Sequence, residues 1–385
     1  MTLINQGFIS LACGSQFTST YSDENGIEWV ADTNFMQEGE ALLAGQHPSK
    51  VLSSMRVFAG NASKYCYSLS NSAVQSQAFF LVRASFWAGT SPLYTPQSVD
   101  GNYRFKLLID ADEWTDLKVP YLGNTNSWRF KEMYVRAQRS SIDVCLARSS
   151  PDGDPPFISA LELRPLPSTL TPAIVMDTFG FDALYLEITR SHYTTTTDYN
   201  LTREAQFACR YPFDPFDRMW SAELIEAEAD RISTNRSINT TTSRNRPPER
   251  ILQSAFVASP SITLSLSKIA EGRTYVAVLY FAEIDPAVTA AGQRVFNVEV
   301  NGELYNTEGP IDAMNMSGGA YDAASYTLVV RPRAGDSQLF FNISAAPSSR
   351  FAPFLAASEF FLLANVTSSA LSFPDDGQFY VRFFF

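Results

Sequence analysis

An internal repeat is the feature that most constrains the fold. The segment DPPFISALELRPL at 154–166 returns as RFAPFLAASEFFLL at 350–363, with a glutamate at the same step of each copy. FLVRASFWAG matches VAVLYFAEID, and YRFKLLIDADEW matches RVFNVEVNGELY, in the same order along the chain. GIEWVADTNF aligns with FDRMWSAELI, which places Trp29 on Trp220. The chain therefore holds two diverged copies of one unit, which divide near 167–176.

Strand patterns dominate both copies. YRFKLLID at 103–110 alternates apolar and polar residues with the period of two that is typical of a half-buried strand. AFFLVRASFW at 78–87 and TYVAVLYFAEI at 274–284 are mostly apolar and predict more fully buried strands. Asn301-Gly302 predicts a tight hairpin turn, because both residues tolerate a positive φ. Helical periodicity is scarce, with one short candidate in SAELIEAEADRI at 221–232.

These patterns predict an all-β protein of two tandem β-sandwiches, jelly-roll-like and with few short helices. We expect the first sandwich at 1–170, the second at 171–365 and a truncated tail at 366–385. A chain of 385 residues, 45% of them hydrophobic, exceeds one usual core and can bury two. The segment at 231–250 carries five arginines and predicts an exposed, solvated loop, with contact to an acidic partner as the alternative.

Charge and hydropathy disfavour several classes of partner. The chain has 29 basic and 40 acidic residues and a net charge of −11, which disfavours nucleic acids and anionic membrane surfaces. No apolar stretch is long enough to span a bilayer, and the first residues show no signal peptide. Because the sequence has no metal-ligand spacing and no cofactor fingerprint, we expect neither a metal nor a cofactor.

Two features nevertheless indicate the secretory pathway. One is the even number of cysteines, which allow three disulfide pairings or can remain free thiols: Cys13, Cys66, Cys145 and Cys209. The other is a set of N-glycosylation sequons, more than this composition predicts by chance. The sequons begin at Asn61, Asn200, Asn235, Asn239, Asn315, Asn342 and Asn365.

Several longer motifs follow one another in a distinctive order. GFISLACGS, MRVFAGNASKYCYSL, RYPFDPFDRMW and PFLAASEFFLL occur in sequence over about 7–363. This order resembles the malectin-like domain of plant receptor-like kinases. The resemblance implies two tandem malectin folds outside the plasma membrane, in receptors that often continue into leucine-rich repeats, a membrane helix and a kinase. We therefore expect an ectodomain alone, at the extracellular face of the plasma membrane or secreted, with no enzymatic activity.

The resemblance implies a recognition module, with a cell-wall carbohydrate or a secreted peptide as ligand and a co-receptor as a further partner. Sugars are bound by flat aromatic faces together with carboxylates and amides. We expect partly exposed rings at strand ends or beside turns to line a groove between the sandwiches or their tips. The candidates are Trp87, Trp114, Tyr280, Tyr65, Tyr67 and Tyr305. Core packing is the alternative for each ring, and a structural adhesion module is the alternative for the chain.

Catalysis has weaker support in the sequence. A glycoside hydrolase needs two carboxyl groups about 5 to 10 Å apart, facing one bond. The candidate pairs are Asp110 with Asp112 and Asp214 with Asp217. A turn and a structural ion pair are the simpler interpretations of these pairs. The two histidines, His47 and His192, belong to no triad or metal pattern.

The repeated glutamates, Glu162 and Glu359, are expected to be structural. Each would be a carboxylate at the rim of its sandwich, hydrogen-bonded to backbone or to an arginine. On this interpretation, glutamine at either position changes stability only modestly and removes no activity.

We predict that the chain is N-glycosylated when it is made in a secretory host, first of all at Asn235 or Asn239. Both sequons lie in the polar segment at 231–250, which the glycosylating enzyme should reach. The measurement is the mass of protein expressed with a leader, before and after enzymatic deglycosylation. An unchanged mass would contradict the assignment.

Overall fold

The structure is a computed structural model that places most of the chain in two compact units. It describes residues 7–16, 19–89, 96–110, 112–121, 127–170, 172, 173, 175, 183–194, 207–224, 231–267, 269 and 272–365. Unit 1 holds the described residues up to Ser168 and those of Pro172–Leu186, and unit 2 holds those of Glu187–Leu363. The expected tail at 366–385 lies outside the described residues, and the expected boundary at 170 and 171 stays a prediction.

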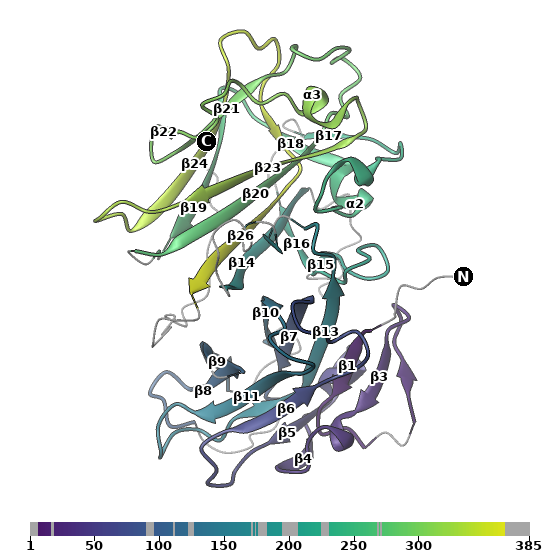
Figure 1. Cartoon of the computed structure of the whole chain (residues 1–385), viewed down its shortest axis with the longest axis vertical. Coiled ribbons are helices and arrows are strands. Elements are labelled where there is room, and N and C mark those ends of the chain that lie inside the picture. The colour runs from purple at the N-terminus through teal and green to yellow at the C-terminus, as the bar shows by residue number, and fades with distance from the viewer. Residues whose placement is uncertain are drawn as a thin grey trace. The chain divides into compact units, whose positions relative to one another are not determined.

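Unit 1 contains three sheets (Figure 1). The main sheet has the order β2 (Tyr21–Ser22), β3 (Glu28–Ala31), β1 (Ile9–Ala12), β13 (Ala160–Leu166), β7 (Phe79–Phe86) and β10 (Arg129–Arg136). The second sheet has the order β6 (Tyr65–Leu69), β11 (Ile142–Arg148), β8 (Asn102–Ile109) and β9 (Asp112–Pro120). The third consists of β12 (Phe157–Ile158), β5 (Ser54–Val57) and β4 (Glu40–Leu43).

Unit 2 repeats this strand order. Its main sheet runs β15 (Phe207–Cys209), β16 (Trp220–Leu224), β14 (Ala183–Thr194, which enters unit 2 at Glu187), β26 (Ala357–Asn365), β20 (Thr274–Ala282) and β23 (Ala323–Val330). The second sheet runs β19 (Ser261–Ser267), β24 (Gln338–Ala345), β21 (Phe296–Val300) and β22 (Glu303–Leu304). The third consists of β25 (Phe354–Leu355), β18 (Ser254–Val257) and β17 (Arg231–Ser233).

The two units have the same strand order, as the repeat in the sequence predicts. In each unit one pair of strands is parallel, β1 with β3 in unit 1 and β14 with β16 in unit 2. Trp29 is the second residue of β3, Trp220 is the first residue of β16, and both are buried. Each indole N–H donates to an aspartate six residues earlier in the chain. The all-β class with few helices is confirmed.

Rings from facing sheets form the core of each unit. Phe86 on β7 lies 5.7 Å from Phe105 on β8, measured between ring centroids. The aligned pair in unit 2, Phe281 and Phe296, lies at 5.0 Å. Burying each such ring contributes about 1.5–3 kcal/mol to folding. The central strands β7 and β20 are buried almost throughout, as their apolar sequences predict.

The described helices are short: α2 (Glu249–Leu252), α3 (Ala313–Ser317) and the 3-10 turns η2 (Asp32–Asn34), η3 (Lys50–Leu52) and η5 (Thr240–Thr242). In the described part of the chain, no helix is long and apolar enough to cross a membrane. The helix expected at 221–232 is wrong in its described residues, which form β16 and β17. Pairing of β16 with β14 and β15 overrides the local helical pattern.

Two cysteines form a bridge within unit 1. Cys66 on β6 and Cys145 on β11 occupy directly opposite positions of the antiparallel pair and form a disulfide. Cys13 and Cys209 are buried free thiols. Of the pairings that the sequence left open, the structure therefore selects a single cross-strand bridge.

We predict that changing both Cys66 and Cys145 to alanine lowers the free energy of unfolding by about 2–4 kcal/mol, because the bridge restricts the unfolded chain. The bridge closes a loop with a sequence separation of 79. Urea unfolding of both proteins measures the difference. Non-reducing peptide mapping should link these two cysteines and leave Cys13 and Cys209 as thiols that alkylate only after denaturation. A double variant as stable as the parent protein, or a bridge to either other cysteine, would contradict this assignment.

Candidate functional site

Five of the six aromatic residues proposed from the sequence are buried. Their side chains are at most 4% exposed: Trp87, Trp114, Tyr280, Tyr65 and Tyr67. The expectation that these rings are partly exposed is therefore wrong. A strand end in a two-layer sandwich still lies between the sheets, so a nearby turn does not expose the side chain. Tyr305, the sixth candidate, is half-buried.

The buried carboxylate of Glu162 lies within the main sheet of unit 1. It accepts a hydrogen bond from Nη1 of Arg83 at 2.9 Å and a second one from Arg164. Arg83 also donates from Nε to Glu132 at 2.6 Å. These residues occupy three adjacent strands, β13, β7 and β10, with Arg83 directly opposite both glutamates. Arg83 therefore lies at the same level of the sheet as Glu132 and Glu162.

The repeated glutamate of unit 2 has a related but longer network. Glu359 on β26 accepts from Nε of Arg190 at 2.6 Å and from the Tyr280 hydroxyl. That hydroxyl in turn accepts from Nδ2 of Asn245 at 2.9 Å. Nη1 of Arg218 lies 3.9 Å from the Glu359 carboxylate. We call Glu359, Arg190, Tyr280 and Asn245 the Glu359 network.

The position expected for the two glutamates was wrong, although the expected type of partner is present. Glu162 is 2% exposed and Glu359 is 1% exposed, so neither lies at a rim. Both bind arginine, as the sequence interpretation required. A buried carboxylate that loses its charge leaves a buried guanidinium without compensation, which costs far more than the same change at the surface. Glutamine at either position should therefore lower stability more than the modest change expected from the sequence.

The carboxylates considered for hydrolysis take part in structural bonds, beginning with Asp110. Asp110 has a positive φ of 51° in the β8–β9 turn. It accepts from Nη2 of Arg139 and from the backbone N–H of Asp143, each at 3.1 Å. Burial and the charge of Asp110 raise the pKa of its neighbour Asp112. These contacts fit the turn role.

The second carboxylate pair is completely buried. Asp214 accepts from Nε of Arg218 and from Nε1 of Trp220, both at 2.7 Å. Asp217 accepts from Nε of Arg210 at 3.0 Å. Both aspartates are 0% exposed. Their oxygens organise the RYPFDPFDRMW turn and offer no face to an external bond.

The two histidines also have structural partners. The His47 ring packs edge-on against Trp87, with ring centroids 4.8 Å apart. His192 lies in β14, where its Nε2 is 3.1 Å from the Ser254 hydroxyl. Burial, aided by the charges of Arg231 and Arg250, lowers the pKa of His192 to about 3. His192 is therefore neutral at any physiological pH.

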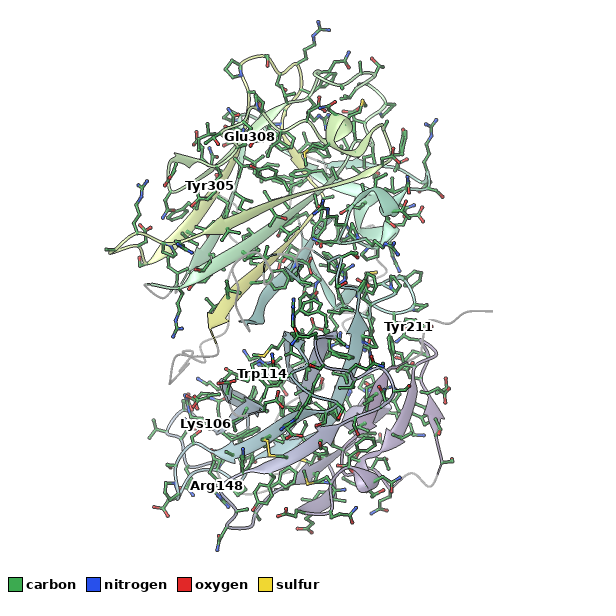
Figure 2. All side chains as sticks on the ribbon, in the orientation of Figure 1. Lys106, Trp114, Arg148, Tyr211, Tyr305 and Glu308 are labelled. Carbon is green, nitrogen blue, oxygen red and sulfur yellow. A yellow bond between two sulfur atoms is a disulfide. The ribbon has the colours of Figure 1, made fainter. Side chains whose placement is uncertain are left out.

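An accessible group of aromatic and charged residues lies along one side of unit 2. β22 ends one sheet and β23 ends the other, and Tyr305 follows β22 directly. The Tyr326 hydroxyl on β23 donates to the carbonyl of Tyr305 at 3.3 Å. Tyr305 and Glu308 both lie on the side of unit 2 that carries β22 (Figure 2). We call Tyr305, Tyr326, Glu303, Glu308 and Arg333 the edge site.

Charged groups surround the two rings of the edge site. Glu303 and Arg333 form an exposed ion pair at 2.7 Å. Burial, then the charge of Glu303, raises the pKa of Tyr305, and burial, then the charge of Glu308, raises that of Tyr326. Half-buried rings beside carboxylates and a guanidinium can stack on a ligand and hydrogen-bond it at the same time. This combination suits a sugar or a polar peptide.

The two units differ at the position of Tyr305. The ring is accessible in unit 2, and the aligned ring in unit 1 is buried. The repeat places Trp114 of β9 on Tyr305. Trp114 is 0% exposed, and its indole N–H has no hydrogen-bond partner among the residues that the structure describes. Figure 2 shows Trp114 beside β8 and β9. Of the two aligned residues, only Tyr305 offers an accessible ring.

Sequence reasoning missed four members of the edge site. Tyr326 and Glu303 lie within strand patterns, and Glu308 and Arg333 lie between strands without a motif. The contact between β22 and β23 is long-range, so no local pattern signals it. Alternation in β23 puts Tyr326 on the same face as the buried Leu328, so the strand pattern does not indicate an accessible ring beside Tyr305.

The described sequons differ in accessibility. Asn61, Asn235, Asn239 and Asn315 are exposed. Asn342 is half-buried in β24, a strand paired on both sides. Asn200 lies outside the described residues, as does the side chain of Asn365. The exposed group is open to a glycosylating enzyme, and glycosylation itself stays a prediction.

The fold and its accessible chemistry define a tandem β-sandwich protein in which one unit presents tyrosines beside charged groups. The malectin-like domain family matches residues 11–363. The chain belongs to the malectin-like family, as its motif order predicted.

The relatives include plant receptor kinases. A probable LRR receptor-like serine/threonine-protein kinase of Arabidopsis thaliana is 30% identical over 295 residues, covering 72% of this chain and 28% of that protein. The nodulation receptor kinase of Pisum sativum is 29% identical over 365 residues, covering 92% of this chain and 34% of that protein. The chain thus spans about a third of the length of these relatives.

Solved structures share the fold. The ANXUR1 extracellular domain from Arabidopsis thaliana has a TM-score of 0.70 at 15% identity, over 96% of this chain and 99% of that one. The crystal structure of the plant peptide RALF23 in complex with FER and LLG2 contains a chain with a TM-score of 0.68 at 18% identity, over 96% of this chain and 98% of that one. At these identities the likeness shows the fold, and it confirms the tandem malectin-type architecture.

We predict that Glu359→Gln lowers the free energy of unfolding by about 3–5 kcal/mol, because it removes the buried negative charge that accepts a hydrogen bond from the buried Arg190. Glu162→Gln should have a similar effect in unit 1. The control is Glu303→Gln, which breaks an exposed ion pair and should cost about 0–1 kcal/mol. Urea unfolding followed by intrinsic fluorescence gives all three values. Equal losses for Glu359→Gln and Glu303→Gln would refute the structural role assigned to the network.

Proposed function

We propose that the chain is the recognition part of an extracellular receptor and binds a secreted peptide together with a co-receptor protein. The observation that carries the proposal is the malectin-like match over residues 11–363, shared with receptor kinases. A structure of the same fold contains a peptide, RALF23, and a further protein, LLG2. That complex supports a peptide ligand and a protein partner for this chain.

The edge site is the surface that we assign to the ligand. Tyr305 and Tyr326 offer ring surface, while Glu303, Glu308 and Arg333 offer charged hydrogen-bonding groups. The same chemistry supports a cell-wall carbohydrate as the second candidate, because sugars stack on rings and bond to carboxylates. A peptide is preferred, since the complex that supports it has the same tandem fold.

Two observations support a location outside the cell. The Cys66–Cys145 disulfide suits an oxidising compartment. Four exposed sequons suit passage through the secretory pathway. The receptor kinases among the relatives point to the outer face of the plasma membrane.

The remaining alternatives are less favoured. A hydrolase would use carboxylates that instead bond to arginines, an indole and the backbone. A structural adhesion module would need no ligand, and the edge site would then be a chance arrangement. Binding measurements separate these alternatives from the proposal.

We predict that Tyr305→Ala weakens binding of RALF23, measured by interferometry in the presence of LLG2, by about tenfold, in line with a central aromatic contact. The control is Tyr21→Ala, a half-buried tyrosine of unit 1. Both variants should melt within a few kelvin of the parent protein. A glycan array run in parallel tests the carbohydrate candidate.

The proposal fails in either of two ways. The parent protein could bind neither the peptide pair nor any glycan, which would favour an adhesion module. Alternatively, Tyr305→Ala could bind as tightly as Tyr21→Ala, which would remove the edge site from the binding surface.

A further inference from the structure

The second sheet of unit 2 carries a sequon on its outer face. Its strand β24 lies between β19 and β21 (Figure 1), and successive side chains of a strand point to opposite faces. Phe341 and Ile343 on this strand are fully buried and point into the sandwich. Phe340 and Asn342 therefore share the outer face, and Asn342 begins the sequon. A glycan attached there would lie on that face.

The atom that glycosylation modifies is accessible. Within the described part of the chain, Nδ2 of Asn342 makes no hydrogen bond, and this atom is not buried. The side-chain oxygen of Asn342 accepts a hydrogen bond at 3.3 Å from Oγ1 of Thr263, which is directly opposite on β19. Because glycosylation leaves that oxygen in place, a glycan and this hydrogen bond are compatible.

Apolar surface next to Asn342 is open to solvent. Phe340 is 37% exposed, and Leu304 on β22 is 42% exposed. Leu304 is directly opposite Glu299 on β21, and Glu299 is directly opposite Asn342, so these side chains share the outer face. Phe340 is closer, because residues two apart on a strand are separated by about 7 Å. A sugar attached to Asn342 reaches the Phe340 ring at that distance.

Phe340 distinguishes this sequon from the others. Of the seven sequons in the sequence, only the one at Asn342 has an aromatic residue two positions earlier. The exposed Asn315 has the buried Ala313 at that spacing. The C–H groups of a sugar ring stack on an aromatic face, while its hydroxyl groups stay in water.

The repeat aligns Asn342 with a disulfide cysteine of unit 1. Cys145 is directly opposite Leu108 on β8. Asn342 is directly opposite Glu299 on β21. The repeat places Leu108 on Glu299. Asn342 therefore occupies, in the second sheet of unit 2, the position that Cys145 occupies in the second sheet of unit 1.

The residue on the neighbouring strand is replaced in the same way. Cys66 is directly opposite Cys145, and Thr263 is directly opposite Asn342. Unit 1 joins this pair of strands by a disulfide, whereas unit 2 joins it by the hydrogen bond between Thr263 and Asn342. A neutral hydrogen bond stabilises a protein less than a disulfide does. At this position, unit 2 therefore has weaker support than unit 1.

We propose that Asn342 carries an N-glycan whose first N-acetylglucosamine packs against Phe340 and covers the outer face of this sheet. The glycan then stabilises unit 2 at the position where a disulfide stabilises unit 1. In the transfer, Nδ2 of Asn342 forms a bond to C1 of the first sugar of an oligosaccharide lipid pyrophosphate. The bond from C1 to the pyrophosphate oxygen breaks, and Nδ2 gives one proton to a base of the transferring enzyme.

The half-buried position of Asn342 does not prevent this modification, because the transfer takes place on the extended chain, before β24 pairs with its neighbours. The inference rests on the extracellular location proposed above and not on the ligand of the edge site. Expression with a leader in a secretory host tests it without RALF23 or LLG2, so the two proposals can fail separately.

The first measurement is the occupancy of Asn342. The full chain is expressed with a leader in a secretory host that adds oligomannose glycans, and its glycopeptides are identified by mass spectrometry. We expect Asn342 to be modified in most of the secreted protein. Secreted, folded protein in which Asn342 is unmodified would overturn the proposal.

Thermal unfolding then measures the contact. Ser344→Ala removes the sequon but keeps Asn342 and its hydrogen bond to Thr263, and it should lower the melting temperature by about 2–4 K. Ser344→Thr keeps the sequon and should match the parent protein. Asn315→Gln removes an exposed sequon of the same unit and should also leave the melting temperature unchanged. Trimming the parent protein to one N-acetylglucosamine per site should have no effect, because the first sugar makes the contact.

A change at Phe340 separates stacking from other effects of the glycan. In a Phe340→Thr protein, Ser344→Ala should make almost no difference, since the two changes remove the same contact. Equal losses with and without the ring, or equal losses for Ser344→Ala and Asn315→Gln, would overturn the proposal in favour of a general effect of glycosylation.

Hydrogen exchange gives a second measurement that needs no change at Phe340. Backbone amides at 338–345 should exchange more slowly in the glycosylated parent protein than in Ser344→Ala, because the glycan supports β24. Equal exchange in the two proteins would contradict the proposed contact.

Discussion

A buried pair of carboxylate and guanidinium lies at the centre of each main sheet, and much of the structure depends on it. Glu162 and Glu359 occupy the same step of the repeat, on β13 and β26, and each bonds to arginine below 3 Å. Such pairs contribute little net stability, but they strongly penalise any arrangement that separates the charges. A one-residue slip in either sheet would separate them. The pair therefore helps to fix register in strands whose apolar side chains alone specify it weakly.

The two units share one arrangement of strands but differ in their exposed surfaces. In unit 1 the hydrogen bonds of Glu162 stay within the strands, because their donors are Arg83 on β7 and Arg164 on β13. In unit 2 the network extends through Tyr280 to Asn245 and so reaches the arginine-rich segment. The aligned positions Trp114 and Tyr305 show the same divergence, one buried and one accessible. Binding surfaces are therefore assigned to unit 2, whose core is repeated but whose exterior is not.

The sequence predicted the fold well and the candidate site poorly. Period-two patterns, the Asn301-Gly302 turn and the repeat are local or self-similar signals, and each is present in the structure. The accessible groups depend on long-range contacts instead. Trp87 and Tyr280 stand at strand ends but lie between sheets, and Tyr305 meets Tyr326 across two sheets. The sequence of 231–250 predicts a solvated loop, because no local pattern marks Asn245 as a buried residue. Asn245 is fixed by its hydrogen bond to Tyr280, which lies 35 residues away along the chain.

The Glu359 network should hold the arginine-rich segment at 231–250 against the core of unit 2. Amide hydrogen exchange of Tyr280→Phe, compared with the parent protein under native conditions, tests it most directly, because the change removes only the hydroxyl between Asn245 and Glu359. We expect faster exchange at 243–248, with β20 and β26 still protected. Unchanged exchange at 243–248 would contradict it, and so would loss of protection throughout unit 2.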